Sequence, residues 1–370
     1  MTLTNDTGTN TDANSDTDRG FNSLKGVPLS IEPLNRKDFT SDQEVRWCPG
    51  CGDYAILAAF LGFMPELGIR RENSVIISGI GCAARFPYYV DSYGMHSIHG
   101  RAPAIATGVA TARPDLAVWV VTGDGDALSI GGNHLIHALR RNVNITILLF
   151  NNQIYGLTKG QYSPTSEAGK VTKSTPMGSV DAPFNPLALA LGAEASFVAR
   201  TIDSDRKHLT EVLKEASRHR GSSFVEIYQN CPIFNDGAFD ELKDSETSAE
   251  AVIRLQHGEP IVFGNEGRLG VRRHPDTGSL EVVEVAEVGR DALVVHDAHD
   301  PDPSYAFALS RLSKPGAMTR SPIGVLRQVE RPSYDDQVRD QLATATGDSE
   351  PDEAELQQLI LGNDTWTVAG

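Results

Sequence analysis

The sequence predicts an α/β domain whose mostly parallel sheet is covered by helices on both faces. Short apolar, β-branched runs alternate along the chain with longer stretches whose apolar residues recur at helical spacing. Glycine and polar residues follow the apolar runs, as they do where a buried strand leads into a turn. This alternation of strand and helix favours βαβ units and therefore a parallel sheet.

The elements follow in chain order. Strands are expected at 73–79, 116–126, 143–152, 195–200 and 222–231. Helices are expected at 101–115, 129–142, 184–192 and 203–219. Pro114 stops the first helix, and two arginines near the end of the second suit a helix C-terminus. Asp203 or Ser204 would cap the helix before the last strand.

The two ends of the chain differ from this central part in composition and in the elements expected there. Residues 1–24 are rich in Thr, Asn and Asp and have little to bury, which predicts disorder. The main domain is expected to span 25–240, and 241–370 reads as an irregular C-terminal extension. The extension is expected to hold a hairpin at 259–285 with its turn at 275–278, a helical piece at 304–313 and a solvated acidic stretch at 346–359.

Composition excludes several classes of protein. The net charge of −16 and the isoelectric point near 5.0 argue against nucleic-acid binding, which needs a concentrated basic surface. No run of about 18 apolar residues is present, so no membrane span is expected. The first residues lack the basic and apolar regions of a secretory signal, which predicts a cytoplasmic protein.

The cysteines are few and stand in unusual settings. They occur in "CPGCG", "GIGC" and "QNCP", at Cys48, Cys51, Cys82 and Cys231. Structural disulfides are not expected in a cytoplasmic chain of this length. Four thiolates suit either a tetrahedral zinc ion or a [4Fe–4S] cluster, and the spacing alone does not separate these two.

The most informative spacing joins "GDGD" at 123–126 with "NN" at 151–152. Asp124 follows one predicted strand and Asn152 follows the next, so both side chains should lie at the carboxyl end of the sheet, where ligands bind in open α/β folds. Carboxylate and amide oxygens suit Mg²⁺ or Ca²⁺. Gly131 and Gly132, at the start of the next helix, are candidates to offer N–H groups to a phosphate.

This stretch resembles the diphosphate-binding domain of thiamine-diphosphate enzymes. Over about residues 40–240, the ordered motifs "CPGCG", "GIGCAARF", "GDGD", "GGNH", "NNQIYGLTKGQYSPTS" and "QNCP" resemble the β subunit of 2-oxoacid:ferredoxin oxidoreductases. The resemblance implies the thiamine-diphosphate-binding fold, with the irregular extension after it.

The resemblance also assigns the site residues. It implies that Mg²⁺ is held by Asp124, Asn152 and the carbonyl of Ile154. It implies that thiamine diphosphate contacts Ile80, Gly81, Cys82, Ala83, Gly125, Asp126, Gly156 and Leu157. One [4Fe–4S] cluster would be held by Cys48, Cys51, Cys82 and Cys231. The chemistry agrees with a cluster, because electrons leave the thiamine adduct one at a time and zinc cannot carry them.

The implied reaction is CoA-dependent oxidative decarboxylation of a 2-oxoacid, with electrons passed to an external ferredoxin. Thiamine activation in this superfamily needs a glutamate from a pyrimidine-binding domain, and only one parallel-sheet domain is expected here. The resemblance therefore implies an α subunit as partner, in an α2β2 assembly. This chain alone is expected to be inactive.

Three residues are candidates for contact with the substrate. Arg85, three residues after Cys82, is a fixed cation suited to the distal carboxylate of 2-oxoglutarate, although an ion pair would explain it equally well. Lys159 in "GLTKGQ" is a second cation, and His99 in "HSIHGR" is a candidate to reach the cofactor or substrate. The sequence, including "YGLTKGQYSPTS" and the acidic C-terminal extension, most resembles those of the 2-oxoglutarate enzymes.

Three alternatives stay open at this point. The first is that the substrate of the oxidoreductase is pyruvate or a broad range of 2-oxoacids. The second is a non-redox thiamine-diphosphate decarboxylase or carboligase subunit with structural zinc. The third is a binding or assembly subunit without catalysis.

Overall fold

The computed structural model describes residues 20–313, 318–347 and 352–368. An eight-stranded sheet forms its centre, with the strand order β2-β1-β3-β4-β8-β7-β13-β9. In that order the strands are Tyr93–His96, Ser74–Ser78, Ala117–Gly123, Thr146–Asn151, Ser223–Tyr228, Phe197–Ile202, Ser321–Gln328 and Val252–Arg254. The strands from β2 to β7 are parallel, which confirms the predicted mostly parallel α/β sheet.

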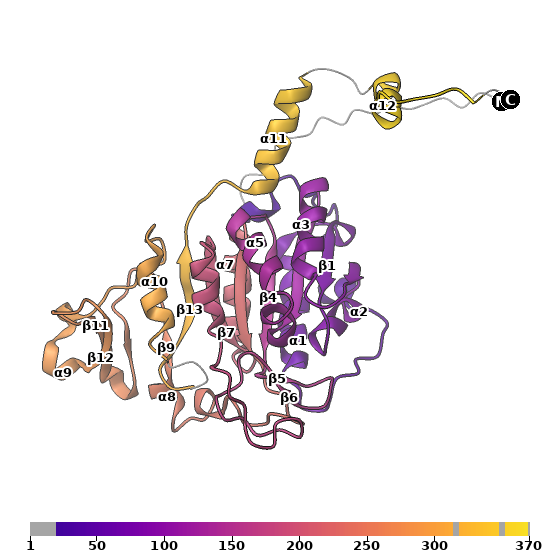
Figure 1. The fold of residues 1–370 in the computed structure, drawn as a ribbon. Coiled ribbons are helices and arrows are strands. Elements are labelled where there is room, and N and C mark those ends of the chain that lie inside the picture. Colours follow the sequence, from indigo (N-terminus) through magenta and orange to yellow (C-terminus); the bar gives the residue numbers. More distant parts are fainter. Residues whose placement is uncertain (1–19, 314–317, 348–351, 369–370) are drawn as a thin grey trace.

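Helices cover both faces of this sheet (Figure 1). The helices α1 (Asp53–Phe63) and α7 (Arg206–Arg218) pack on one face. On the other face lie α3 (Ala102–Ala112), α5 (Gly132–Arg141), α6 (Pro186–Gly192) and α10 (Pro303–Ser310). Because side chains alternate along a strand, Trp119 and Val121 of β3 face α1, while Val118 and Val120 enter the opposite core. A strand that is buried on both faces explains the continuous apolar runs.

Aromatic packing anchors the first of these cores. Phe60 of α1 is fully buried, and its ring meets that of Trp119 edge to face, with centroids 5.1 Å apart. Such a pair contributes about 0.5–1.5 kcal/mol beyond burial itself, which is worth about 1.5–3 kcal/mol for a Phe side chain. This packing holds α1, the helix that follows the cysteine-rich loop, against the sheet.

The remaining elements are short. They include α2 (Phe86–Tyr89), α4 (Asp124–Leu128), α8 (Ser248–Ala251) and α9 (Val285–Val288). A small sheet joins β10 (Val262–Phe263), β11 (Leu269–Arg273) and β12 (Leu280–Glu284), so the hairpin expected at 259–285 is present with one further strand. A two-stranded ribbon of β5 (Ile154–Tyr155) and β6 (Gln161–Tyr162) follows β4.

The main sheet does not end near residue 240, which differs from the expected domain boundary. Strand β13 pairs antiparallel with β7, and β9 pairs with β13. The sequence predicts no strand at β13, whose residues SPIGVLRQ do not form a continuous apolar run. The C-terminal part of the chain therefore completes the core that the earlier strands begin.

The chain ends also differ in part from their prediction. Residues 1–19 of the expected disordered segment lie outside the described residues, but Leu24 is buried against the core. Helix α7 is capped by Asp205, whose side chain accepts from the N–H of His208 at 3.1 Å, rather than by Asp203 or Ser204. Asp203 instead accepts from the main-chain N–H of Asn230 at 2.8 Å.

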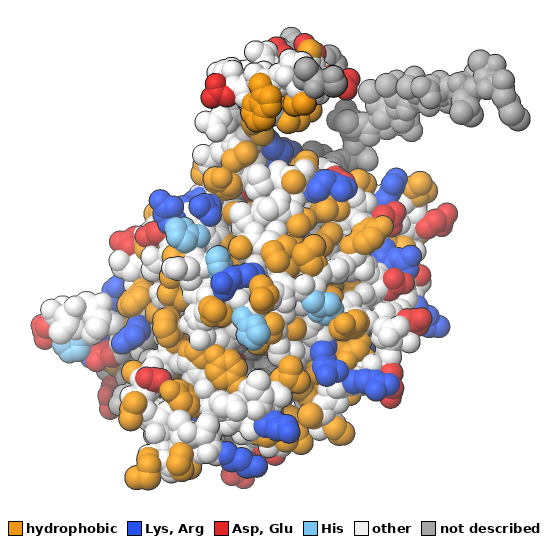
Figure 2. Space-filling model, turned by 45° about the vertical axis from the view of Figure 1, so that its right-hand side comes forward, with side chains coloured by type: hydrophobic (Ala, Val, Ile, Leu, Met, Phe, Trp, Pro, Cys, Tyr) orange, Lys and Arg blue, Asp and Glu red, His pale blue; other side chains and the backbone are white. Residues whose placement is uncertain are grey.

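Helices α11 (Tyr334–Thr346) and α12 (Glu353–Leu361) follow β13 and rise from the end of the sheet opposite the β5–β6 ribbon (Figure 1). The described residues of α12 are all exposed, and Figure 2 shows its apolar side chains at the top of the molecule. This agrees with the expected solvated stretch at 346–359, of which 348–351 lie outside the described residues. Among the helices of the described chain, none combines the length and the apolar character that crossing a bilayer requires.

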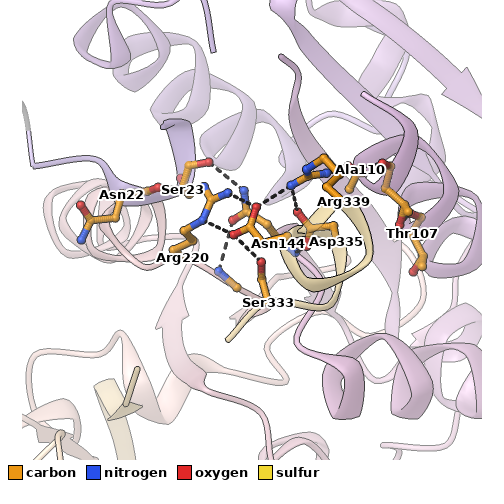
Figure 3. A network of polar contacts seen from close by, with 12 residues as sticks. Asn22, Ser23, Thr107, Ala110, Asn144, Arg220, Ser333, Asp335 and Arg339 are labelled. Carbon is orange, nitrogen blue, oxygen red and sulfur yellow. Dashed lines mark hydrogen bonds and ion pairs between the residues drawn. The ribbon is translucent and has the colours of Figure 1, made fainter. Parts of the chain in front are cut away.

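A polar network fixes α11 to the body (Figure 3). Asp336 accepts from two nitrogens of Arg220 at 2.6 and 2.7 Å and from the hydroxyl of Ser333 at 2.8 Å. Arg339 reaches Asp335 and Asp336 at 2.9 and 2.6 Å, and Asp335 accepts from the N–H of Asn144. Hydrogen bonding from Arg220 holds the pKa of Asp336 well below its ordinary value.

Replacing Asp336 by Asn should lower the free energy of unfolding at pH 7 by about 1 kcal/mol, a modest amount because solvent screens these partly exposed partners. A depressed carboxyl pKa stabilises the fold above the unfolded value of about 3.9, and this contribution is lost as the pH falls below it. Urea unfolding at pH 7 and pH 3.5 measures both effects, and the difference from wild type should shrink at the lower pH. Asp340→Asn on the exposed side of the same helix is the control. An equal urea midpoint for Asp336→Asn and wild type at pH 7 would contradict the assignment.

Candidate cofactor and redox site

A cavity of about 260 Å³ opens at the carboxyl ends of β1, β3 and β4. The residues predicted to bind the magnesium ion and the thiamine cofactor all line it, together with His99. These lining residues are Ile80, Gly81, Cys82, Ala83, Asp124, Gly125, Asp126, Asn152, Ile154, Gly156 and Leu157. The parallel strands bring them together because their carboxyl ends meet at one edge of the sheet.

Asp124 is the first residue of α4, directly after β3, and it is only 2% exposed. Its Oδ2 accepts hydrogen bonds from the hydroxyl of Ser163 at 2.5 Å and from that of Thr165 at 2.6 Å. Burial raises the pKa of Asp124 to about 6. The two hydroxyls fix the direction of the carboxylate, and a cation beside it would offset the cost of burying its charge.

Asn152 and Ile154 supply the other candidate oxygens. The Nδ2 of Asn152 donates to Oε1 of Gln229 at 3.0 Å, and its Oδ1 accepts from the N–H of Ile154 at 3.2 Å. An amide oxygen has a second lone pair, so Oδ1 keeps one acceptor position for a ligand. One carboxylate, one amide oxygen and one main-chain carbonyl form a set of hard donors that suits Mg²⁺ with room for diphosphate oxygens.

Asp126, in the wall of the same cavity, joins two loops by hydrogen bonds. Its Oδ1 accepts from the N–H of Gly100 at 2.6 Å and its Oδ2 from the hydroxyl of Thr122 at 2.8 Å. These bonds tie the loop before α3 to the turn after β3. Burial raises the pKa of Asp126 above its ordinary value.

Gly125 is required by a close approach. A Cβ at this position would lie 2.2 Å from the ring of Tyr155, whose hydroxyl donates to the carbonyl of Gly125 at 2.9 Å. The contact holds β5 against the start of α4. Gly131 and Gly132 donate their N–H groups to the carbonyls of Asp126 and Ser129, so these groups are not offered to a phosphate as the sequence suggested.

The four cysteines are free thiols, and two of them, Cys82 and Cys231, flank Gly156. A Cβ on Gly156 would lie 3.5 Å from Sγ of Cys231 and 3.8 Å from Sγ of Cys82. Burial, with the charges of Asp53, Cys231 and Cys48 added, raises the pKa of Cys82 to about 12. Burial also raises the pKa of Cys51. As free groups both thiols therefore stay protonated at neutral pH, and binding a metal would require them to lose their protons.

In residues 20–313, 318–347 and 352–368, no group of three or more His, Cys, Asp or Glu side chains is arranged to hold a metal ion. A [4Fe–4S] cluster takes one thiolate on each of four irons, so its ligands stand farther apart than the four that surround one zinc ion. Cys48, Cys51, Cys82 and Cys231 are the thiols that could serve as its ligands.

Asp53 was missed by the sequence reasoning, although it directly follows the "CPGCG" motif. It is 1% exposed, lines the cavity, and neither of its carboxyl oxygens has a hydrogen-bond partner in the described part of the chain. Burial raises its pKa to about 7. Ser163, Thr165 and Gln229 were missed as well, and the only signal was that they fall within the quoted motifs "NNQIYGLTKGQYSPTS" and "QNCP".

The two predicted cations take different positions. Arg85 lines an adjoining cavity of about 600 Å³, which shares Ile80, Gly81 and Leu157 with the first. It has no ion-pair partner among the described residues. Lys159 is exposed, has a left-handed backbone (φ 77°), and lines neither cavity. The structure thus places Arg85, and not Lys159, next to the cofactor cavity.

Comparisons with known proteins relate the chain to a family and to a solved structure. Residues 79–227 match the family model described as thiamine pyrophosphate enzyme, C-terminal TPP binding domain. The chain is 64% identical over 343 residues to the 2-oxoglutarate oxidoreductase subunit KorB of Mycobacterium tuberculosis, covering 93% of this chain and 91% of that protein.

The chain belongs to the family of 2-oxoacid:ferredoxin oxidoreductase β subunits. Another of these β subunits, the 2-oxoglutarate synthase subunit KorB of Archaeoglobus fulgidus, is 45% identical over 186 residues, which cover 50% of this chain and 69% of that protein. A solved 2-oxoglutarate:ferredoxin oxidoreductase from Magnetococcus marinus, with 2-oxoglutarate, coenzyme A and succinyl-CoA bound, superposes with a TM-score of 0.71 at 35% identity, covering 90% of this chain and 99% of that chain.

These findings confirm the predicted family and the thiamine-diphosphate-binding fold. The roles of individual residues in the β subunit stay predictions.

Proposed function

We propose that this β subunit, together with an α subunit, converts 2-oxoglutarate and coenzyme A to succinyl-CoA and CO₂ and passes two electrons to ferredoxin. The name of the M. tuberculosis relative and the ligands of the M. marinus structure support this substrate pair. The observation that carries the proposal is that Asp124, Asn152 and Cys82 line a single cavity. A diphosphate-bound cofactor and a redox centre would meet there.

In this proposal Asp124, Asn152 and the Ile154 carbonyl hold Mg²⁺, and the four cysteines hold one [4Fe–4S] cluster. When bound, thiamine diphosphate supplies an electron sink that lets the substrate lose its carboxylate. Ser163 and Thr165 donate to one oxygen of the Asp124 carboxylate and hold its orientation in the cavity, where it would bind the cation. Cys82 lies in the cavity wall, so a cluster held by this cysteine would stand beside the bound cofactor and would supply a one-electron acceptor there.

The proposed partner subunit is inferred from a residue type that the described cavity lining does not contain. In the described residues the cavity lining offers no glutamate that could contact the far end of the cofactor. We infer that the α subunit supplies the pyrimidine-binding domain and that two αβ pairs associate as α2β2. Ferredoxin is the proposed external acceptor and the cytoplasm the proposed location, where four free thiols stay reduced.

Arg85 is proposed to bind the distal carboxylate of 2-oxoglutarate. Replacing it by Gln should raise the KM for 2-oxoglutarate by about 10–100-fold, since a hydrogen bond to a charged group is worth about 1.5–3 kcal/mol. Turnover of pyruvate, which lacks this carboxylate, should change little. Arg46→Gln is a matched control, because Arg46 lines the same adjoining cavity but pairs with Glu44. Equal losses with both substrates would rule out this role.

The function is tested by anaerobic co-purification with the α subunit, followed by iron, sulfide and zinc analysis and a visible spectrum. About four irons per αβ pair, with absorbance bleached by 2-oxoglutarate plus coenzyme A, is the expected result. Bleaching by pyruvate alone would keep the family and change the substrate. Zinc without iron would leave a thiamine-dependent enzyme without redox chemistry.

A further inference from the structure

We infer that Gln229 is a positioning residue that joins the two cofactor sites: one end of its amide orients the magnesium ligand Asn152, and the other end donates to the sulfur of Cys51. The inference rests on the proposed magnesium and cluster sites. It gives a role to a residue that lies in the motif "QNCP" but to which the motif assigns none, and it assigns a separate task to each end of one side chain.

The main chain fixes Gln229 where β8 ends. Its N–H donates to the carbonyl of Asn151 at 2.9 Å, which continues the pairing of β8 with β4. The residue is 1% exposed and lines the cofactor cavity. A buried polar side chain must find partners within the protein, so the contacts of this amide are specific.

The oxygen end acts on the magnesium ligand. Oε1 of Gln229 accepts from Nδ2 of Asn152 at 3.0 Å. The side-chain amide of Asn152 has one donor end and one acceptor end, so holding its nitrogen with Gln229 turns its oxygen away from Gln229. Partners of this kind set the orientation of metal ligands, and their loss typically weakens metal binding by about 10–100-fold.

The nitrogen end acts on the cluster ligand. Nε2 of Gln229 donates to Sγ of Cys51 at 3.3 Å and also to the carbonyl of Asn230. Hydrogen bonds to cluster sulfurs are among the factors that set the reduction potential. A donor stabilises the more negative, reduced cluster, so this bond should raise the potential. The cluster would then accept an electron from the adjacent cavity more readily.

Two substitutions separate the two ends. Gln229→Glu keeps an acceptor for Asn152 but removes the donor to Cys51 and adds negative charge. Gln229→Met removes both functions with little change in volume. The cluster-loaded αβ complex, freed of thiamine diphosphate, is used for two measurements: a redox titration of the cluster and a fluorescence titration with thiamine diphosphate and Mg²⁺.

Both variants should lower the ratio of reduced to oxidised cluster at a fixed potential, by up to about tenfold, which equals about 59 mV for a one-electron couple. Only Gln229→Met should weaken Mg²⁺-dependent binding of thiamine diphosphate, by about tenfold or more. Gln328→Met, at the end of β13 and outside this cavity, should change neither value.

An unchanged potential in both variants of a complex that holds its cluster would overturn the inference. So would equal weakening of thiamine diphosphate binding in both variants, because that outcome indicates a general packing role. If the wild-type complex itself contains no iron and sulfide, the proposed function fails instead, and the two failures are thereby distinguished.

Discussion

Replacing Asp124 by Asn should abolish turnover by removing Mg²⁺-dependent binding of thiamine diphosphate. The carboxylate is the one charged ligand in the proposed set, and an amide in its place offers a weaker oxygen for a hard cation. Loss of partners that only orient a ligand already costs about 10–100-fold in metal affinity, so loss of the ligand charge should cost at least about 100-fold. Isothermal titration of the αβ complex with thiamine diphosphate at fixed Mg²⁺ measures this.

The fold should survive this change. Asp124 is buried with its pKa raised by burial, so the neutral Asn removes an unfavourable buried charge from the metal-free protein. The unfolding midpoint of the metal-free variant should therefore match or exceed that of wild type. Asp181→Asn, in an exposed position outside the cavity, is the control for handling and assembly. Undiminished thiamine diphosphate affinity in Asp124→Asn would remove this residue from the metal site.

Replacing Cys82 by Ser should eliminate electron transfer to ferredoxin. Cys82 is the cysteine that lines the cofactor cavity, and Cys231 lies beside it across Gly156. A serine hydroxyl is a poor substitute for a thiolate on iron, so the iron content should fall from about four per αβ pair to near zero. Ferredoxin reduction should fall to less than about 1% of wild type, because no other one-electron carrier is proposed in this chain.

The neighbouring change Ala84→Ser tests whether any polar substitution in this loop has the same effect. Ala84 is half-buried two residues after Cys82, and its variant should keep both iron and activity. Iron, sulfide and visible absorbance are measured on both variants under anaerobic conditions. A full complement of iron with an unchanged spectrum in Cys82→Ser would show that Cys82 is not a ligand.

The part of the cavity formed by residues at the ends of strands could be predicted from the sequence. Asp124 and Asn152 each follow a strand that reads as a continuous apolar run, and parallel pairing then brings the two together. The individual lining residues came from a resemblance to a known family rather than from the pattern of the chain. The sequence predicted that Arg85 is a cation near Cys82, and the structure shows that Arg85 lines the adjoining cavity.

Other residues could not be found in this way. Ser163 and Thr165 reach Asp124 from a loop 39 and 41 residues further along the chain, and no periodicity predicts how an irregular loop returns. Gln229 looks like an ordinary residue at a strand end until its partners are known. Strand β13 was missed for a similar reason, since its pairing with β7 is decided by tertiary contacts and not by local spacing.

The late position of β13 has a consequence for how the protein is made. Ribosomes synthesise β7 more than a hundred residues before β13, yet β13 is the strand that covers the outer edge of β7. Until residue 328 has left the ribosome, that edge has unpaired N–H and C=O groups able to pair with other chains. The residues proposed to bind the metal and the cluster are thus synthesised well before the strand that covers this edge of the sheet.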